Sequence, residues 1–429
     1  MAKKHIHIIG GGLAGLSAAV FLSSRTDAQI ALYEGSPTFG GRARSFYDSK
    51  LDRLIDNGNH LILSGNDAVF DYLNKIDSMN SLTSSGIPLF PFFDLDENKH
   101  WDVSLSNGRF PWWLFSKNRR VPGFKFPELM ALWHLIKANH SQTVADCLVN
   151  GEFSRRLLKP FAISVLNTSC EVGSAILLGS VVRQSLLKGG KACVPYFPRE
   201  GLSETFVKPA LSLIKLQGGK VHATSRLSEL HRKDGYIDYF IVNNEKIELN
   251  SEDQVILAVN PYTARQVLSP ILPDIPLPDE FESILNLHYK VDFALQMKGS
   301  VEKARFIGVI GGISEWIFVK DGVISVTVSA ANRFTGSDPE NLSKLIWQEI
   351  RKTLEPFLFS LLPEYVPSYR LLWEKRASFA ATIEQNKRRP SCYTICPNLF
   401  LAGDWTATGL PSTIEGAIRS GYKAAQAIL

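Results

Sequence analysis

The sequence contains little cysteine and no long uncharged apolar run. Its five cysteines are odd in number and scattered over 429 residues, which argues against a disulfide framework and for a reducing compartment. Cys392 and Cys396 have no Cys or His partner close enough in sequence to complete a zinc site, so no metal is expected. No signal peptide is visible, and no apolar stretch of about 18 residues predicts a transmembrane helix. The protein is therefore expected in the cytoplasm, with contact at a membrane surface left open.

Charge excludes a second class of partner. The formal net charge is only +5, and no long basic run or RNA-binding signature is present, so nucleic acid is not an expected ligand. Hydrophobic residues make up 45% of the chain, which is normal for a protein with a sizeable core. A chain of 429 residues is long for one domain and suits two lobes.

The N-terminal region carries a dinucleotide-binding pattern. His5–Ile9 is predicted as a buried strand and Leu13–Ser24 as a helix, with Gly10, Gly12 and Gly15 between and after them in the spacing G-x-G-x-x-G. Gly10 suits a tight turn, Gly12 lets the backbone approach a pyrophosphate, and Gly15 lets helix and strand pack closely. Free N–H groups of the first helical turn, which includes Leu13 and Ala14, would face the phosphates.

Two further features extend this pattern. Glu34 ends the next predicted strand, 19 residues after Gly15, where a carboxylate can accept hydrogen bonds from a ribose. The sequence Gly40-Gly41-Arg42 follows directly, so a second backbone approach and a charge-assisted contact to phosphate are expected there. This arrangement resembles the flavin amine oxidase and phytoene desaturase superfamily, whose cofactor is FAD.

The resemblance also assigns roles near the end of the chain. It implies that a final strand ends at Gly403-Asp404, with the carboxylate near the FAD ribityl-phosphate region, and that the next helix, starting at Thr413-Ile414, points its N-terminus at the flavin. Gly416, Gly421 and neighbouring small residues form a bare helix face that can press against a ring or against a neighbouring backbone. A backbone contact to the adenine is implied near Leu227.

The implied fold is α/β (α+β), with a Rossmann-like FAD-binding domain interrupted by a substrate domain of mixed sheet and helices. "GVIGGISEWIFVKDGVISVTVSAAN" is expected to form strands of the substrate-domain sheet. No second nucleotide fingerprint is visible, so the source of reducing equivalents and the oligomeric state stay open. The expected FAD-binding segments are 1–62, 200–268 and 396–429, and the expected substrate segments are 63–199 and 269–395.

The first substrate segment is rich in aromatic residues with cations around them. Two explanations are equally open: a patch that contacts a membrane surface, or a core edge with a solvated basic rim. Either favours an apolar ligand. The aromatic residues are Phe90, Phe92, Phe93, Phe110, Trp112, Trp113, Phe115, Phe124 and Phe126, and the cations are Arg109, Lys117, Arg119, Arg120 and Lys125.

Candidate catalytic groups lie in two short stretches. "LIDNGNHLIL" contains Asp56 and His60 as candidate catalytic residues, with Asn57 and Gly58 as candidate cofactor contacts. "LLWEKRASFAAT" contains Glu374 and Arg376. Polar groups in apolar surroundings near a flavin are plausible proton donors, because burial raises the pKa of a carboxyl group.

A closer resemblance covers nearly the whole chain. "RLIDNGNHLIL", "NGRFPWWLF", "LLKGGKACVPYFPREGLSE", "WEKRASFAAT" and "NLFLAGDWTATGLPSTIEGAIRSG" are similar to bacterial hydroxysqualene dehydroxylases of squalene and hopanoid biosynthesis. The resemblance implies reduction of hydroxysqualene to squalene by reduced, non-covalently bound FAD. Rival interpretations are a carotenoid-type desaturase, a flavin amine oxidase, and a non-catalytic prenyl-lipid carrier like the GDP-dissociation inhibitors. Cys392 lies too close to Gly403 to match the cysteine that carries covalent flavin in some amine oxidases.

Overall fold

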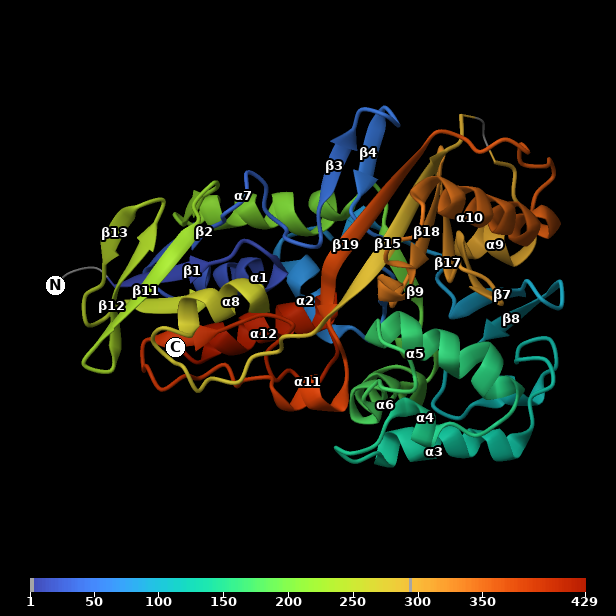
Figure 1. The fold of residues 1–429 in the computed structure, drawn as a ribbon, viewed down its shortest axis with the longest axis horizontal. Helices are drawn as coiled ribbons and strands as arrows, with labels where there is room; N and C mark the ends of the chain where they lie inside the picture. The colour runs from blue at the N-terminus through green and yellow to red at the C-terminus, as the bar shows by residue number, and fades with distance from the viewer. Residues whose placement is uncertain (1–3, 293–294) are drawn as a thin grey trace.

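A five-stranded parallel sheet organises the lobe in which both ends of the chain lie (Figure 1). The computed structural model describes residues 4–292 and 295–429. Ile8 in the central strand pairs with Leu32 on one side and Ile256 on the other, and all three are fully buried. Such two-sided burial explains why these strands are continuous apolar runs. In sheet order they are β10 (Lys220–His222), β2 (Gln29–Tyr33), β1 (His5–Ile9), β14 (Gln254–Leu257) and β20 (Leu399–Leu401).

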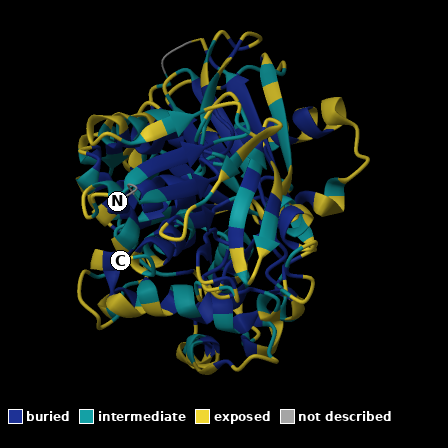
Figure 2. Cartoon of the chain, turned by 90° about the vertical axis from the view of Figure 1, so that its left-hand side faces the viewer, coloured by how far each residue is buried: buried dark blue, intermediate teal, exposed yellow. Residues whose placement is uncertain are grey.

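Helices cover one face of this sheet and a small antiparallel sheet covers the other. In Figure 2 the strands are dark blue, and exposed positions concentrate in the surrounding loops and helix surfaces. The strand at His5–Ile9 is predicted correctly, and the predicted helix ends one residue earlier than expected, at Ser23. The helices are α1 (Leu13–Ser23), α7 (Lys208–Leu216) and α12 (Ile414–Gln426); α8 (Pro261–Leu268) lies on the opposite face with β11 (Leu227–Lys233), β12 (Tyr236–Val242) and β13 (Glu245–Glu248).

A seven-stranded mixed sheet forms the second lobe. One face of this sheet packs on α10 (Pro339–Leu354), and its other face is turned towards the first lobe and α5 (Lys159–Leu166). Two of its strands lie within the stretch expected to form this sheet and a third overlaps the start of that stretch, which confirms the prediction. In sheet order the strands are β19 (Tyr369–Phe379), β15 (Phe281–Lys290), β18 (Val323–Val328), β17 (Trp316–Lys320), β16 (Phe306–Ile310), β7 (Leu89–Asp94) and β8 (Lys99–Ser104).

A group of helices completes the second lobe, at the lower right of Figure 1. The π-helical turn η4 (Ser154–Leu158) leads directly into α5. All five cysteines are buried as free thiols. No helix in the described residues is long and apolar enough to cross a membrane. The remaining helices of this group are α3 (Met130–Lys137), α4 (Val144–Cys147) and α6 (Ala175–Gln184), and α9 (Gly299–Ala304) lies beside β16.

Helix α2 (Asp67–Lys75) belongs with the first lobe, although it follows residue 62. Its N-terminal N–H groups at Ala68 and Val69 donate to the buried carboxylate of Glu415 on α12, at 3.1 and 3.0 Å. We therefore propose that the first FAD-binding segment extends beyond residue 62. Small strands connect the lobes: β3 (Ser45–Asp48) with β4 (Arg53–Asp56), and β5 (Ile62–Leu63) and β6 (Leu82–Ser84) with β9 (Pro195–Pro198). A short helix, α11 (Ile383–Lys387), precedes β20.

Candidate active site

The β1–α1 turn requires glycine at two positions and is open at a third. Gly10 has φ +116°, and a Cβ there would lie 2.4 Å from the carbonyl oxygen of Ala258. A Cβ on Gly15 would lie 1.9 Å from the carbonyl oxygen of Gly10. Gly12, by contrast, has nothing within 4 Å of its Cβ position and caps α1 without a side-chain hydrogen bond. The turn therefore exposes backbone N–H groups to open space, as a pyrophosphate site requires.

Glu34 and Leu227 lie at the same edge of this turn. The Glu34 carboxylate accepts one hydrogen bond from Gly11 N–H and one from Ser36 N–H, both at 2.8 Å. The backbone carbonyl of Glu34 accepts from Ser225 N–H at 2.7 Å, which holds the segment leading to Leu227 beside it. The structure thus brings together the two residues expected to contact the adenosine part of a dinucleotide.

The second glycine pair lies directly on the first turn. Gly40 N–H donates to Gly11 O at 2.8 Å, and a Cβ on Gly41, where φ is +58°, would lie 3.3 Å from the Cα of Gly12. The following Arg42 forms an ion pair with Asp404 at 2.6 Å and donates to Ala377 O at 2.6 Å. The start and end of the chain therefore meet at this point.

Burial and nearby cations act in opposite directions on Asp404. Burial raises the pKa of its carboxyl group, but the Arg42 guanidinium outweighs burial and holds that pKa below its usual range. Arg389 donates to the Asp404 carbonyl at 2.9 Å, and burial lowers the pKa of its own guanidinium to about 10. Gly403 has φ +141° and donates its N–H to Ser420 Oγ at 2.8 Å, which fixes the turn before Asp404.

Helix α12 begins where the sequence predicts, with Thr413 as its N-cap and Ile414 as its first residue. Thr413 Oγ1 accepts from Gly416 N–H at 3.0 Å. A Cβ on Gly421 would lie 2.1 Å from the carbonyl oxygen of Ala14 and 2.2 Å from Ser17 Oγ. The bare helix face was expected to press against a ring or against a neighbouring backbone. At Gly421 it packs closely against the backbone of α1.

The loop after β4 packs on the large sheet. Asp56 accepts hydrogen bonds from Ser45 Oγ at 2.7 Å and Leu202 N–H at 2.8 Å, and pairs with Lys320 at 2.9 Å. Burial raises the pKa of Asp56, but Lys320 and these hydrogen bonds lower it below its ordinary value. Asp56 is therefore an ionised group at neutral pH, which does not suit it as a proton donor.

The next residues attach the loop to β15 and β18. The carbonyl of Asn57 accepts from Asn286 Nδ2 at 3.2 Å, and a Cβ on Gly58 would lie 3.2 Å from the same nitrogen. Asn59 Nδ2 donates to Thr327 Oγ1 at 3.1 Å, and its buried Oδ1 has no partner within the described chain. Gly58 thus permits close packing between the lobes.

His60 lies at the end of this polar loop. Burial lowers the pKa of its imidazole to about 4, Asp56 opposes that shift, and the positive charges of Lys320 and Arg42 add to it. At neutral pH the His60 ring is therefore uncharged and available for hydrogen bonding. Glu374 lies opposite Ile284 in the β19–β15 pair and acts electrostatically on Arg42.

Arg376 is not brought into this group. It is exposed, and its guanidinium lies 4.1 Å from the ring centroid of the exposed Tyr262. This cation–π contact holds the guanidinium at Tyr262, and a catalytic role for Arg376 stays a prediction.

An aromatic wall starts beside His60. Leu61 packs against Phe306 and Phe318 on the sheet face turned towards α5. Phe306 lies 5.9 Å from Trp316 and 6.0 Å from Phe90, measured between ring centroids. The Trp316 indole N–H donates to Ser164 Oγ on α5, so the wall bridges the sheet and the helical group. The polar loop is thus followed in the chain by an apolar cluster of aromatic rings.

Comparison with known proteins gives the family. A model of flavin-containing amine oxidoreductases matches residues 13–429. A hydroxysqualene dehydroxylase of Zymomonas mobilis is 40% identical over 424 residues, covering 99% of this chain and 98% of the relative. The chain belongs to the hydroxysqualene dehydroxylase family of flavin-containing amine oxidoreductases.

More distant proteins match nearly the whole chain. A 15-cis-phytoene desaturase of Synechococcus elongatus is 22% identical, covering 99% of this chain and 95% of the relative. The crystal structure of cyclohexylamine oxidase from Brevibacterium oxydans superposes with a TM-score of 0.70 at 14% identity, covering 99% of this chain and 98% of that one. These matches confirm the predicted Rossmann-like fold with its inserted sheet.

As in other members of the family, FAD is the cofactor of this dehydroxylase-family chain. The residues present fit it: the open Gly12 backbone, the uncapped start of α1 and the carboxylate of Glu34 lie along one edge of the parallel sheet. The contacts of individual residues with FAD stay predictions.

Sequence reasoning missed several polar residues of this family member's site. Lys320 pairs with Asp56 from 264 positions away, and Arg389 contacts the Asp404 backbone from an unremarkable basic run. His288 is buried, bonded to Ser325 Oγ at 2.7 Å, and burial and Lys320 lower its pKa to about 4. Only the alternation of polar residues along β15 could have indicated Asn286 and His288 as one face of a strand.

Proposed function

We propose that this protein removes the hydroxyl group of hydroxysqualene reductively and releases squalene, using non-covalently bound FAD. Full-length similarity at 40% identity to a protein of that activity carries the proposal. The polar loop that ends at His60, followed by the aromatic wall at Phe306 and Trp316, supports it.

The reaction balances as hydroxysqualene plus two electrons and two protons giving squalene plus water. One proton leaves with the hydroxyl oxygen as water when the C–O bond breaks, and the carbon then takes a hydride. Reduced FAD supplies that hydride when it is bound. The protein must therefore deliver a proton, hold the substrate cation and exclude water that would re-form the alcohol.

The aromatic wall performs the second and third of these tasks. Ring faces such as those of the half-buried Phe90 and Trp316 attract a cation through their quadrupoles, and the apolar side chains packed around them exclude water from the carbon centre. A saturated aliphatic wall would exclude water equally well but would stabilise the cation less.

We assign the first task to Glu374 and a positioning role to His60. Asp56 is paired with Lys320 and ionised, and Arg376 is exposed, so neither is suited to deliver the proton. His60 is neutral at pH 7 and can hold the substrate hydroxyl by a hydrogen bond. Glu374 is half-buried and, like His60, lies within electrostatic reach of Arg42.

A single-turnover experiment tests the function. Pre-reduced holoenzyme is mixed anaerobically with hydroxysqualene, and flavin absorbance and products are followed together. We expect one squalene formed for each flavin reoxidised. Reduced flavin that persists in the presence of hydroxysqualene would reject the proposal.

The 22% identity to a phytoene desaturase over the full chain favours one alternative, a carotenoid-type desaturase. That reaction runs in the opposite electronic direction, because substrate is oxidised and flavin reduced. Oxidised holoenzyme supplied with phytoene under anaerobic conditions should keep its flavin oxidised; bleaching of the flavin would favour the desaturase.

Both proposed substrate and product are apolar and accumulate in bilayers. We therefore also propose that the protein works from the cytoplasm at a membrane surface. The electron donor for FAD is external to the chain and is left unassigned.

A further inference from the structure

A cluster of large apolar side chains is exposed on the second lobe. Trp112 is 65% exposed and Phe115 59%, although each is surrounded by other aromatic rings. The ring centroids of Phe110 and Trp112 are 4.4 Å apart, and those of Phe115 and Phe126 are 5.2 Å apart. These rings thus form one continuous surface instead of scattered positions. We call it the aromatic patch; its members are Phe110, Trp112, Phe115 and Phe126, continued on α3 by Met130 and Trp133.

Short helical turns present these side chains outwards. The turn η2 (Trp112–Phe115) buries Trp113 and Leu114 and leaves its two other rings exposed. The turn η3 (Phe126–Leu129) and α3 follow, with Met130 and Trp133 three residues apart on one helix face. The buried half of each turn fixes the exposed half in place.

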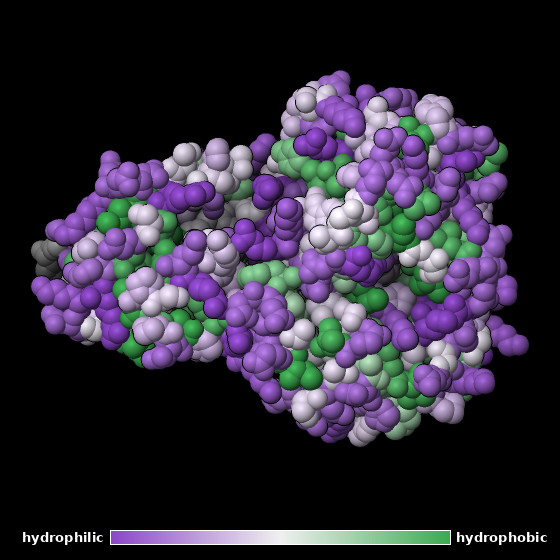
Figure 3. Space-filling model, viewed as in Figure 1, coloured by the Kyte–Doolittle hydropathy of each residue, from purple (hydrophilic) through white to green (hydrophobic). Residues whose placement is uncertain are grey.

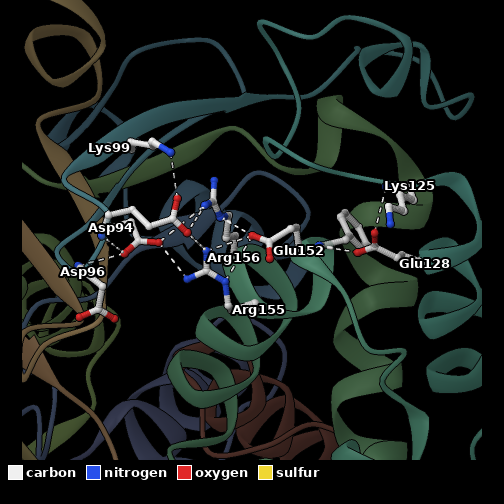
Figure 4. Close-up of polar contacts among 10 residues, drawn as sticks. Asp94, Asp96, Lys99, Lys125, Glu128, Glu152, Arg155 and Arg156 are labelled. Atoms are coloured by element: carbon white, nitrogen blue, oxygen red, sulfur yellow. Dashed lines mark hydrogen bonds and ion pairs between the residues drawn. The ribbon is translucent and has the colours of Figure 1, made fainter.

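The patch is mounted on a polar framework (Figure 4). The buried carboxylate of Glu128 accepts from Lys125 N–H at 2.9 Å and Phe153 N–H at 2.6 Å, which fixes the loop on either side of Phe126. Beside it, Arg155 and Asp94 form an ion pair at 2.9 Å between η4 and β7. The exposed rings therefore need no rearrangement to meet a partner.

Most of the charge in the segment that carries the patch has one sign. Between residues 103 and 137 the sequence has six Lys or Arg residues and one acidic residue, Glu128, which is buried. Lys117 and Lys125 are exposed between the rings. Arg119 and Arg120 add positive charge while their guanidinium groups donate to backbone carbonyls of Leu105 and Leu114, at 2.7 and 2.6 Å.

A basic recess borders the patch. It has a volume of about 300 Å³ and is lined by Arg109, Lys188 and Lys191, with the carboxylate of Asp67 paired to Lys188 at 3.1 Å. Arg109 is adjacent to Phe110 in the chain, so the recess and the rings form one surface. On the face shown in Figure 3, hydrophobic (green) and hydrophilic (purple) residues adjoin over the right-hand lobe.

We propose that the aromatic patch and its basic border dock the protein on an anionic lipid bilayer. Exposed Trp and Phe beside Lys and Arg are the composition that sits at the headgroup layer, with rings among the acyl carbons and cations at lipid phosphates. The aromatic wall of the active site lies on the same lobe. In that lobe Phe92 of β7 stacks on Trp101 of β8, with 5.6 Å between the ring centroids. Docking here places the substrate lobe at the bilayer.

A second exposed apolar cluster provides an internal comparison. Phe359, Leu361 and Tyr365 are each about 70% exposed between α10 and β19. Residues 355–368 contain two glutamates and no Lys or Arg, and the cations near them are Lys298, 5.4 Å from the Phe359 ring centroid, and Arg351, which pairs with Glu364. Exposure of apolar side chains is therefore matched, and this segment lacks the run of cations that the aromatic patch carries.

Vesicle co-sedimentation of the full-length holoenzyme tests the proposal without any turnover, so its result does not depend on the proposed function. Vesicles of phosphatidylcholine with phosphatidylglycerol should bind the protein, and vesicles of phosphatidylcholine alone should bind it much less. The double variant Trp112→Ser/Phe115→Ser should lower the partition coefficient by about tenfold or more. The matched variant Phe359→Ser/Tyr365→Ser should bind like the parent protein.

Charge variants separate the electrostatic contribution. Lys117→Gln/Lys125→Gln should weaken binding to anionic vesicles by about fivefold for each charge removed. The control Lys215→Gln/Lys220→Gln removes two exposed lysines from the other lobe and should change binding little. Retained flavin absorbance and an unchanged far-UV circular dichroism spectrum confirm that each variant is folded.

Insertion of the patch is measured directly on the parent protein. Brominated lipid should quench tryptophan fluorescence, and the conservative variant Trp112→Phe should bind equally while losing part of that quenching. Three results would overturn the proposal: patch variants that bind like the parent, equal losses from both double variants, or a dimer in vesicle-free solution that the patch substitutions dissociate.

Discussion

The guanidinium of Arg42 lies 2.6 Å from the carboxylate of Asp404, which follows it by 362 positions in the chain. Asp404 is buried, and Arg42 is about one-third exposed. The pair therefore joins the glycine-rich start of the FAD-binding lobe to the strand and helix that end it. Breaking it should affect both stability and cofactor retention.

Arg42→Ala leaves the buried Asp404 carboxylate without its main counter-ion. We expect a loss of about 3 kcal/mol in the free energy of unfolding of the apoprotein, at the lower end for a broken buried pair because Arg389 stays nearby. FAD should also dissociate more readily. Urea unfolding and gel-filtration retention of flavin measure both effects. Arg376→Ala is the control, because that exposed side chain should change stability by less than about 0.5 kcal/mol.

Two glycines of α12 should respond differently to one methyl group. Gly421→Ala places a Cβ 2.1 Å from the Ala14 carbonyl oxygen and should destabilise the fold by about 1–3 kcal/mol, since α1 and α12 must separate. Gly416→Ala meets its nearest atoms at 3.2 Å and should be tolerated much better. Thermal unfolding of the two apoproteins makes the comparison, and equal melting temperatures would contradict this packing.

Three histidines, the buried His7 and His288 and the half-buried His60, should make stability depend on pH. Burial lowers the pKa of His7, His60 and His288 from 6.5 to about 4, so between these values the unfolded chain binds protons that the folded chain does not. Stability is thus complete above pH 6.5 and falls as pH drops towards 4, by at most roughly 3 kcal/mol for each histidine.

Urea titrations at pH 7 and pH 5 should show this loss, and His288→Gln should reduce the slope. Asp56 and Asp404 contribute in a lower window, because their lowered pKa values make their stabilisation present above pH 4 and lost as pH falls further. A pH-independent midpoint between 7 and 5 would contradict the assignment of buried neutral rings.

Proton delivery and positioning should be separable in kinetics. Glu374→Gln removes the proposed acid and should lower the single-turnover rate about 100-fold or more while substrate binding is kept. His60→Gln retains a hydrogen-bonding amide and should mainly weaken substrate binding. A general acid acts only when protonated, so a pH–rate profile that loses its fall at high pH only in Glu374→Gln would support the assignment; loss of that fall in His60→Gln instead would transfer the role.

Asp94 tests the framework under the aromatic patch (Figure 4). Its fully buried carboxylate pairs with Arg155 at 2.9 Å and accepts from Asp96 N–H at 3.1 Å. Asp94→Ala should cost about 1–3 kcal/mol, because Arg155 and the Asp96 N–H lose a buried acceptor while Arg156 keeps Glu97 and Glu152, both at 2.6 Å. Lys99→Ala, at an exposed pair of the same cluster, should be close to neutral in chemical unfolding.

Local patterns allowed much of the FAD lobe to be predicted. Gly10, Gly12, Gly15 and Glu34 lie within 25 residues, and a strand–turn–helix–strand unit constrains them through backbone geometry alone. Boundaries agreed to within a residue for His5–Ile9 and for α1. The placement of α2 was not accessible in this way, because its partner, Glu415, lies almost 350 positions later.

The sequence by itself determined a dinucleotide turn, the polar loop from Asp56 to His60, and an unusual supply of aromatic residues, since each depends on neighbours in the chain. Only tertiary structure decided that Lys320 neutralises Asp56, that Gly421 packs on α1, and which aromatic rings are buried in a wall and which are exposed on the patch. These outcomes depend on contacts between segments hundreds of residues apart. The burial and the charge partners of a residue at such a contact depend on the folded protein, so no periodic pattern in the sequence predicts them.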